Sequence, residues 1–257
     1  MIDDHSDEEM DIRLLHKTES TNALALKAVE AGAPQGTVFV ADSQSEGRGR
    51  RQEEGGRRQW FSPAGKNLYL SVVLRPILDL QKCSALTVAV GARLVEFLRR
   101  QTGAEIQLKW PNDLMINRQK VAGILTEGIT GAAGLEGVVV GLGLNINSAA
   151  DDFPEALRPI ATSLYEECGH RFDRLSLALQ IPPVVVDASQ RYAEHGLEAF
   201  SEAIERWDYL RGRSVRVIQD GVDALGEARG IGSGGGLMVA FEDGRLEEII
   251  SGEVFVQ

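Results

Sequence analysis

The feature of the sequence that most restricts its fold is a series of short strand-like segments joined by tight turns. The expected strands in the middle of the chain are residues 105–110, 114–116, 120–127 and 138–144, with a turn at 117–119 and a glycine-rich loop at 128–137. Strands joined by tight turns pair in antiparallel fashion, whereas parallel strands need a long crossover between them. The sequence therefore predicts a mixed, largely antiparallel sheet rather than a doubly wound parallel one.

Helical spacing elsewhere predicts helices that pack on this sheet, so the expected fold class is α+β. Residues 80–101 carry apolar side chains three and four positions apart and stop near a glycine. A shorter helix follows the cluster Ser20-Thr21-Asn22 and ends at another glycine. Residues 175–207 are also mostly helical in pattern. The pair Pro182-Pro183 is expected to interrupt them, because proline cannot sit inside an undisturbed helix.

The character of the chain changes at Arg211. Short apolar stretches such as VRVI, LMVAF and EVFV are separated there by Gly and Asp turns, which is typical of a small all-β unit. We therefore expect three parts: a flexible acidic tail at residues 1–11, a larger unit at 12–210 and a small β unit at 211–257.

The bulk composition is acidic, with one basic segment. The 257 residues carry a formal net charge of −11, which argues against a nucleic-acid binder that works by bulk charge. Against this background, five arginines fall between Arg48 and Arg58. An acidic, polar N-terminus is unlike a signal peptide, and no apolar run approaches the ~20 residues that span a bilayer. Cys83 and Cys168 show no metal or redox spacing. We expect a cytoplasmic protein without a metal site of its own.

The arginine–glycine loop Gly47-Arg48-Gly49-Arg50-Arg51 is the first candidate for chemistry. Glycines allow the backbone to approach an anion closely, and guanidinium groups grip phosphate oxygens with paired hydrogen bonds. A solvated basic loop or a nucleic-acid contact explains the loop equally well when it is taken alone. Its position directly after a strand of an acidic protein favours a focused anion site.

Three further motifs carry polar side chains that have ordinary structural explanations. Asn112 and Asp113 follow Trp110-Pro111 and suit a turn, although Asp113 could also face a metal-bound nucleotide. Lys120 opens a strand, where lysine is usually a solvated edge residue. Ser20, Thr21 and Asn22 are good helix caps and could equally present polar groups to a ligand.

The stretch Gly141-Leu-Gly143-Leu-Asn145 superficially suggests a dinucleotide fingerprint. The third glycine is missing and no helix follows, so a nicotinamide site is not expected.

Taken in order, these segments resemble the biotin–protein ligase family, in the form without an N-terminal DNA-binding domain. The matching motifs are ESTN (19–22), Q-x-x-GRGR (44–50), W-F-S-P-x-G-x-N-L-Y-L-S (60–71), KWPNDL (109–114), K-x-AGIL-x-E (120–127) and VVVGLGLNIN (138–147). The resemblance implies a class II synthetase-like catalytic unit followed by a small SH3-like β-barrel. It also implies two steps: biotin and MgATP give biotinyl-5′-AMP, and a lysine of a carboxylase's biotin-carrier domain then takes the biotin. A homodimer is plausible, and neither nucleic acid nor membrane is expected as a partner.

The resemblance also implies roles for particular residues. Lys120, Arg48 and Arg50 are the expected catalytic cations, which cancel the repulsion between a carboxylate and a phosphate. The expected biotin-binding residues are Ser20, Thr21, Asn22, Gln44, Gly47, Arg48, Gly49, Arg50, Lys120 and Gly123. The expected ATP-binding residues are Arg48, Arg50, Trp60, Asp113 and Asn145.

One departure from the family pattern concerns the segment between the arginine loop and Trp60. The residues RQEEGG lengthen it, so the closure of this loop is expected to differ, and we predict that residues 47–58 are mobile without ligand and ordered with it. Three alternatives remain: a lipoate or octanoate transferase, which shares the fold; a non-catalytic sensor that kept the pocket; and an RNA-binding protein that uses the arginines.

Overall fold

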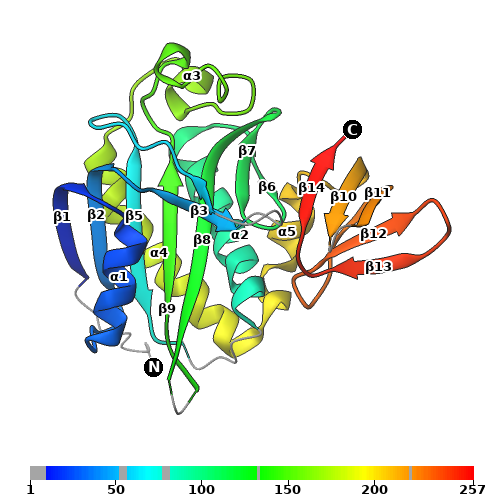
Figure 1. Cartoon of the computed structure of the whole chain (residues 1–257), viewed down its shortest axis with the longest axis horizontal. Helices are drawn as coiled ribbons and strands as arrows, with labels where there is room; N and C mark the ends of the chain where they lie inside the picture. The colour runs from blue at the N-terminus through cyan, green and yellow to red at the C-terminus, as the bar shows by residue number, and fades with distance from the viewer. Residues whose placement is uncertain (1–9, 52–56, 77–81, 132–133, 220–221) are drawn as a thin grey trace.

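A seven-stranded sheet forms the body of the molecule (Figure 1). The computed structural model describes residues 10–51, 57–76, 82–131, 134–219 and 222–257. In sheet order the strands are β1 (Asp11–Thr18), β2 (Thr37–Gln44), β5 (Leu68–Leu74), β9 (Gly134–Leu144), β8 (Gln119–Gly131), β7 (Asp113–Ile116) and β6 (Ile106–Lys109). Only the β1–β2 pair is parallel within this sheet, and every other neighbouring pair is antiparallel. The expectation of a mixed, largely antiparallel sheet is confirmed.

The predicted loop at residues 128–137 is wrong. β8 and β9 continue as a long hairpin whose pairing extends to Gly131 and Gly134, with residues 132–133 outside the described part. Paired strands satisfy each other's backbone N–H and C=O groups, so a glycine-rich stretch can remain in the ladder when its partner is continuous.

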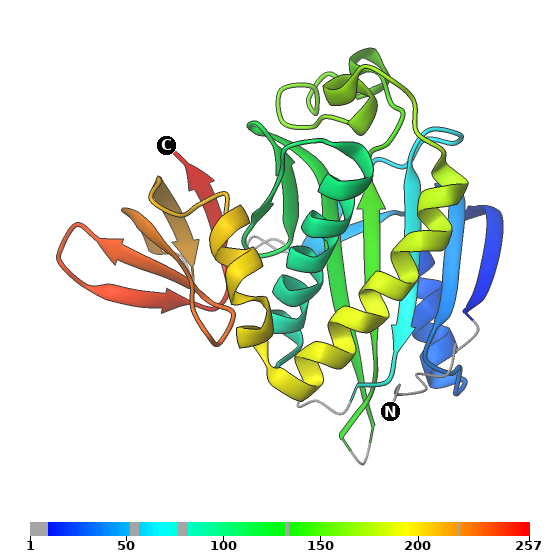
Figure 2. The same cartoon turned by 180° about the vertical axis from the view of Figure 1, so that it is seen from behind.

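Helices cover both faces of the sheet (Figure 2). Helix α1 (Thr21–Glu30) lies on one face and buries Ala25 and Val29 against β5 and β9. Helices α2 (Cys83–Thr102) and α4 (Arg174–His195) lie on the other face, where α2 buries most of its apolar side chains in the main core. The left-handed Gly103 ends α2, with a φ of 73° that a side chain would disfavour.

Helix α4 runs without interruption through Pro182 and Pro183, so the expected break at this pair is wrong. Pro182 is buried among the side chains that pack on α2, whereas Pro183 lies on the exposed face. Packing along the buried face compensates for the two backbone donors that the prolines lack. Among the described residues, no helix is long and apolar enough to cross a membrane.

A second, five-stranded antiparallel sheet forms the C-terminal part and lies beside β6 (Figure 1). Its strands, in sheet order, are β13 (Leu246–Ile249), β12 (Leu237–Phe241), β11 (Val222–Ile231), β10 (Ser214–Gln219) and β14 (Glu253–Val256). Helix α5 (Ser201–Trp207) leads into it, and the buried Trp110 donates a hydrogen bond from Nε1 to the carbonyl of Gly235, 2.9 Å away. The second sheet is thereby fixed against the segment that follows β6.

Candidate functional site

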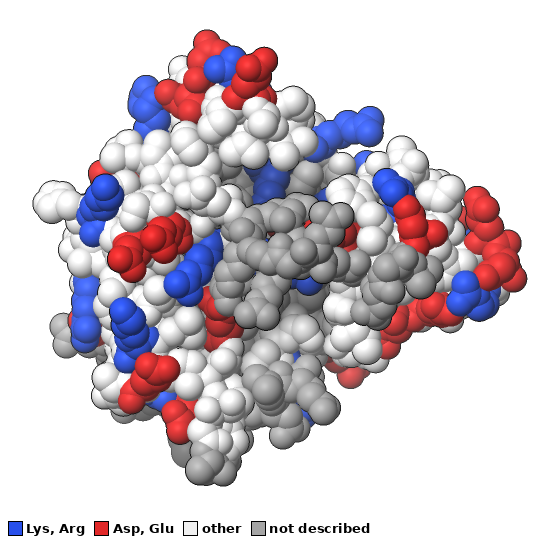
Figure 3. Space-filling model, viewed as in Figure 1, with Lys and Arg blue, Asp and Glu red and all other residues white. Residues whose placement is uncertain are grey.

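A cavity of about 470 Å³ opens on the α1 side of the large sheet. Its walls come from the start of α1, the hairpin of β3 (Arg48–Arg51) and β4 (Arg57–Gln59), the neighbouring ends of β6–β9 and the segment after β9. Residues 251–255, which form the bend before β14 and most of β14 itself, close one side. Figure 3 shows the same face with its charges, and a basic side chain lies in the hollow below the α3 segment (Leu164–Cys168). Segments far apart in the sequence therefore meet around one chamber.

The start of α1 forms the polar end of the cavity. Ser20 caps the helix by accepting a hydrogen bond from the N–H of Ala23, as capping residues do. The backbone N–H and the hydroxyl of Thr21 both donate to Gln44 Oε1, at 2.8 and 3.1 Å. Gln44 Nε2 in turn donates to Ser62. The capping interpretation and the ligand-facing interpretation of this cluster are thus compatible.

Asn22 is held at the same end of the cavity by three groups. Its Nδ2 donates to the carbonyl of Leu125 and to Glu127 Oε2, and its Oδ1 accepts from the fully buried Ser71 at 2.6 Å. Ser20, Thr21 and Asn22 are each at most 4% exposed. Buried polar groups that are bonded in this way have fixed orientations, so this end of the cavity is organised before any ligand arrives. We call Ser20, Thr21, Asn22, Gln44 and Ser71 the polar pocket.

Glycines form the floor beside the polar pocket. A methyl group on Gly141 would lie 1.9 Å from Asn22 Oδ1, and one on Gly143 would lie 2.5 Å from the Trp60 ring. A methyl group on Gly123 would contact both Trp60 and Lys120 at about the closest distance that real side chains reach, 3.0 to 3.1 Å. Glycine inside a strand marks a place where another group approaches the backbone closely. The floor therefore has no room for side chains.

Lys120 and Asp113 form an ion pair at the side of the cavity, with Lys120 Nζ 2.5 Å from Asp113 Oδ1. The same ammonium lies 5.1 Å from the centre of the Trp60 ring, within the range of a cation–π interaction. Asp113 is paired with Gly123 across β7 and β8, and the Lys120 ammonium and the Trp60 ring both lie against Gly123, so these groups meet at one point of the sheet. Lys120 is a cavity residue and not only a solvated edge lysine.

The arginine hairpin, β3 with β4, crosses the mouth of this chamber. Arg48, Gly49 and Arg50 line the cavity, and Arg48 is exposed while Arg50 is partly buried. Gly47 does not line it and packs instead against the segment after β4, where a methyl group would come within 2.7 Å of Ser62 Oγ and the Trp60 carbonyl. Residues 52–56 of the long connection lie outside the described residues, so the predicted mobility of 47–58 stays a prediction.

The remaining predicted nucleotide contact, Asn145, has a structural partner as well. Asn145 is buried and lines the cavity, but its Nδ2 donates to the carbonyl of Thr162 at 3.0 Å. This bond fixes the segment after β9 against the cavity wall. Asn112, which was expected to build the turn, donates from Nδ2 to the carbonyl of Ile124 at 2.7 Å, so it bonds the neighbouring strand β8 and not the turn backbone.

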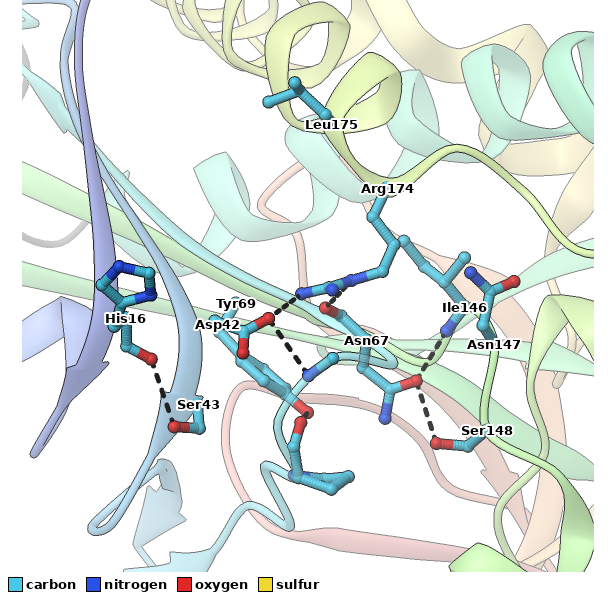
Figure 4. Close-up of polar contacts among 12 residues, drawn as sticks. His16, Asp42, Ser43, Asn67, Tyr69, Ile146, Asn147, Ser148, Arg174 and Leu175 are labelled. Atoms are coloured by element: carbon cyan, nitrogen blue, oxygen red, sulfur yellow. Dashed lines mark hydrogen bonds and ion pairs between the residues drawn. The ribbon is translucent and has the colours of Figure 1, made fainter.

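A second polar network anchors the segment that joins Trp60 to β5 (Figure 4). Asp42 Oδ1 accepts hydrogen bonds from the N–H of Gly65 at 3.1 Å and from Arg174 Nη2 at 2.7 Å. Arg174 Nε donates to the carbonyl of Asn67, and Asn67 Oδ1 accepts from the N–H of Ile146. Burial alone would raise the pKa of Asp42, but the bonds from Arg174 and Gly65 outweigh it, and the pKa lies below its ordinary value.

Several residues of the cavity were not predicted from the sequence. They are Gln59, Phe61, Leu70, Lys109, Trp110, Pro111, Asn112, Ile124, Leu125, Gly141, Leu142, Gly143, Phe153, Leu157, Ile160, Ala161 and residues 251–255. Glycines alternating within an apolar strand were a usable signal for Gly141 and Gly143. No local pattern marks the contribution of residues 251–255, because it depends on how the second sheet packs.

Comparison with known proteins gives consistent results. The model of the biotin/lipoate A/B protein ligase family matches residues 14–145. The chain is 33% identical over 235 residues to the bifunctional ligase/repressor BirA of Bacillus spizizenii, covering 91% of this chain and 70% of the relative. It is 31% identical over 258 residues to the biotin–[acetyl-CoA-carboxylase] ligase of Mycobacterium tuberculosis, covering 93% and 86%. The structure superposes on the biotin protein ligase from Aquifex aeolicus in complex with biotin and ATP, with a TM-score of 0.80, 30% identity and coverage of 96% and 98%.

The chain belongs to the biotin/lipoate A/B protein ligase family. The resemblance to biotin–protein ligases that its motifs indicate is confirmed, as is the expectation of a ligase fold with a small C-terminal β sheet.

Proposed function

We propose that this chain is a biotin–protein ligase that makes biotinyl-5′-AMP from biotin and MgATP and transfers biotin to a lysine of a carboxylase's biotin-carrier domain. The observation that carries the proposal is the polarity of the cavity. A prearranged set of neutral donors and acceptors lies at one end, and Lys120, Arg48 and Arg50 gather at the other side. Biotin has the same polarity, with a neutral ureido head and a carboxylate tail.

The polar pocket suits the ureido head. Thr21 and Asn22 offer hydroxyl and amide groups whose orientation is fixed by Gln44 and Ser71, and Ser20 offers a hydroxyl that accepts the cap bond from Ala23. A site that is built to hydrogen-bond a polar group rejects ligands that lack this group far better than an apolar slot rejects a misfit. Lipoate, the other acid in the family's name, and octanoate carry no ureido head, so the polar pocket favours biotin over both.

The cations suit the first reaction step. A carboxylate oxygen of biotin attacks the α-phosphorus of ATP, the bond from this phosphorus to the bridging oxygen breaks, and pyrophosphate leaves. Two anions must approach each other, so fixed positive charges lower the barrier. Lys120 would bridge the carboxylate and the α-phosphate, with Arg48 and Arg50 on the phosphate side. Magnesium would neutralise the remaining phosphate charge, with Asp113 near it.

The second step needs access for the acceptor lysine and exclusion of water from the activated carbonyl group. The uncharged amine of the acceptor lysine attacks the carbonyl carbon, the amide forms, AMP leaves with the electrons of the carbon–oxygen bond, and the amine nitrogen loses a proton. Trp60 would cover the adenylate. Its buried Nε1 has no acceptor among the described residues, which leaves a donor for a ligand in the cavity. Asn145 would contact the adenine from its place in the wall.

The proposal also covers the organisation of the chain. We place the catalytic unit at residues 12–210 and the SH3-like unit at 211–257, with the cytoplasm as the working compartment and a homodimer as the assembly.

Biotin-dependent exchange of labelled pyrophosphate into ATP tests the activity, with lipoate and octanoate as competing acids. We expect exchange with biotin alone. Lys120→Ala should lower the exchange rate about 10²- to 10³-fold, because a preorganised charge at the reacting groups is lost. The matched control is Lys27→Ala on the exposed face of α1, which should exchange at the wild-type rate. Exchange with the fatty acids only would contradict biotin as the substrate, and tight biotin binding without exchange would indicate a sensor.

A further inference from the structure

A cluster of arginines surrounds Trp207 at the junction of the two sheets, outside the cavity described above. Arg99 of α2 and Arg206 of α5 lie over the Trp207 ring, with guanidinium carbons 3.7 and 4.8 Å from its centre. Arg213 stacks on Tyr209 at 4.2 Å, and Arg118 projects from the turn between β7 and β8. We call Arg99, Arg118, Arg206 and Arg213 with Trp207 the arginine cup; Glu105, Gln107 and Asn117 complete its lining.

The arginine cup is a concentrated positive site in an acidic chain. Glu105 is the one carboxylate in its lining, and it forms an ion pair with Arg99. Within the described ranges, Arg118, Arg206 and Arg213 form no ion pair. A guanidinium that is stacked on an aromatic ring keeps its in-plane N–H donors for a carboxylate, and the stacking fixes its position. The cup is therefore organised to bind anionic groups.

The strand register places the cup next to the candidate active site. Lys109 pairs with Asp113 and Gln107 pairs with Met115, so Gln107 projects from the same face of the sheet as Lys109 and Asp113, which line the cavity. Two residues along a strand span about 7 Å. Arg118 lies in the turn directly before β8, the strand that carries Lys120. The cup lies at the outer ends of the strands that hold the reacting groups.

We propose that the arginine cup docks an acidic face of the protein domain whose lysine accepts biotin. The inference rests on the proposed function, which requires a folded protein to bring a lysine amine to Lys120. A domain of ~80 residues has a radius of gyration of about 12 Å, so it covers the surface well beyond the cavity mouth. A chain with a net charge of −11 repels an acidic partner unless a local positive patch attracts and orients it.

The test separates docking from chemistry. Arg118→Glu with Arg206→Glu reverses two exposed members of the cup. Arg13→Glu with Arg191→Glu changes the net charge equally at exposed positions on β1 and α4, away from the cup. Each variant is assayed for biotin-dependent pyrophosphate exchange and for transfer to hydroxylamine. Each is also assayed for transfer to a purified biotin-carrier domain of an acetyl-CoA carboxylase at several salt concentrations. If the double variant unfolds at a lower temperature than wild type, the single variant Arg118→Glu, whose substitution lies in an exposed turn, replaces it in these assays.

We expect the cup variant to raise KM for the carrier domain about tenfold, because two favourable charge contacts become repulsive. Exchange and hydroxylamine transfer should stay at wild-type rates, the salt dependence of the carrier KM should weaken, and a carrier with acidic residues changed to lysine should recover part of the loss. An unchanged KM in the cup variant, or an equal rise in the control variant, would overturn the inference. Absence of exchange in the wild-type chain would instead contradict the proposed function. Exchange without transfer to the carrier would contradict the docking partner alone.

Discussion

The polar pocket and the arginine hairpin face the same cavity, yet they are built in opposite ways. Thr21, Asn22 and Ser71 are buried and bonded to one another or to the backbone before any ligand is present. Arg48 projects from a four-residue strand and is exposed. A neutral head group is recognised by the direction of its hydrogen bonds, which requires fixed partners. A phosphate is recognised by charge, which long flexible side chains can supply when it arrives.

This difference predicts different costs when each region is damaged. Removing a member of the polar pocket leaves a buried donor or acceptor without its partner, so stability and ligand affinity should fall together. Removing an exposed arginine leaves nothing unsatisfied in the protein, so only the reaction should suffer. The following substitutions test this separation, in order of expected effect.

Arg48→Ala should lower the rate of adenylate formation about 10²-fold, since a charge that cancels repulsion at the α-phosphate is lost. The midpoint of thermal unfolding should stay within about 1 °C of wild type, because exposed substitutions usually change stability by less than ~0.5 kcal/mol. Single-turnover adenylation with saturating biotin and ATP measures the rate. Arg13→Ala, which removes an exposed arginine from β1, is the matched control. A drop of several degrees in the unfolding midpoint of Arg48→Ala would show that the hairpin is part of the stable frame.

Gln44→Ala should weaken biotin binding about tenfold and lower the free energy of unfolding by about 1 to 2 kcal/mol. Gln44 Oε1 accepts two hydrogen bonds from Thr21, and its loss leaves both donors without this acceptor. Calorimetric titration with biotin and urea unfolding provide the two measurements.

Gln44→Glu is the informative companion of this variant. It keeps an oxygen for Thr21 but loses the donor to Ser62, so its stability should lie between those of the alanine variant and wild type. If biotin affinity falls in Gln44→Ala while stability is unchanged, the polar pocket and the hairpin do not differ in the way we describe.

The sequence predicted the two regions unequally. The antiparallel sheet followed from the short strands and their turns, and Ser20, Thr21 and Asn22 were recognised as both caps and candidate ligands. The bonds from Thr21 to Gln44 and from Ser71 to Asn22 join residues 23 and 49 positions apart, so only the folded sheet reveals them. Gly141 and Gly143 were considered only as part of a dinucleotide fingerprint, which was rejected. The structure gives another reason for them, because a side chain at either position would collide with Asn22 or Trp60. Residues of β14 line the cavity because the two sheets pack against each other, and local sequence patterns do not encode this packing.

The polar network around Asp42 provides the test with the smallest expected effect. Asp42 holds Gly65 and Arg174, so it fixes the segment after Trp60 without touching a reacting group. Its side chain is 39% exposed, and pairs of this kind contribute up to about 1 kcal/mol. Asp42→Asn should therefore lower the free energy of unfolding at pH 7 by about 0.5 to 1 kcal/mol and change the adenylation rate by less than about twofold.

The pH dependence identifies the carboxylate as the cause. Because the pKa of Asp42 is lower in the folded chain than its ordinary value of 3.8, its ionised form stabilises the fold above that value. This contribution is lost as the pH falls from 3.8 through the folded pKa. We therefore expect the difference in free energy of unfolding between wild type and Asp42→Asn to shrink as the pH is lowered from 7. Urea unfolding at pH 7 and at successively lower pH measures this difference. If this difference in free energy of unfolding stays constant with pH, the loss of stability comes from the geometry of the Gly65 turn and not from the charge of Asp42. A large fall in the adenylation rate of Asp42→Asn would mean that the arginine hairpin must be held rigidly in order to act. The hairpin would then resemble the polar pocket more than its contacts indicate.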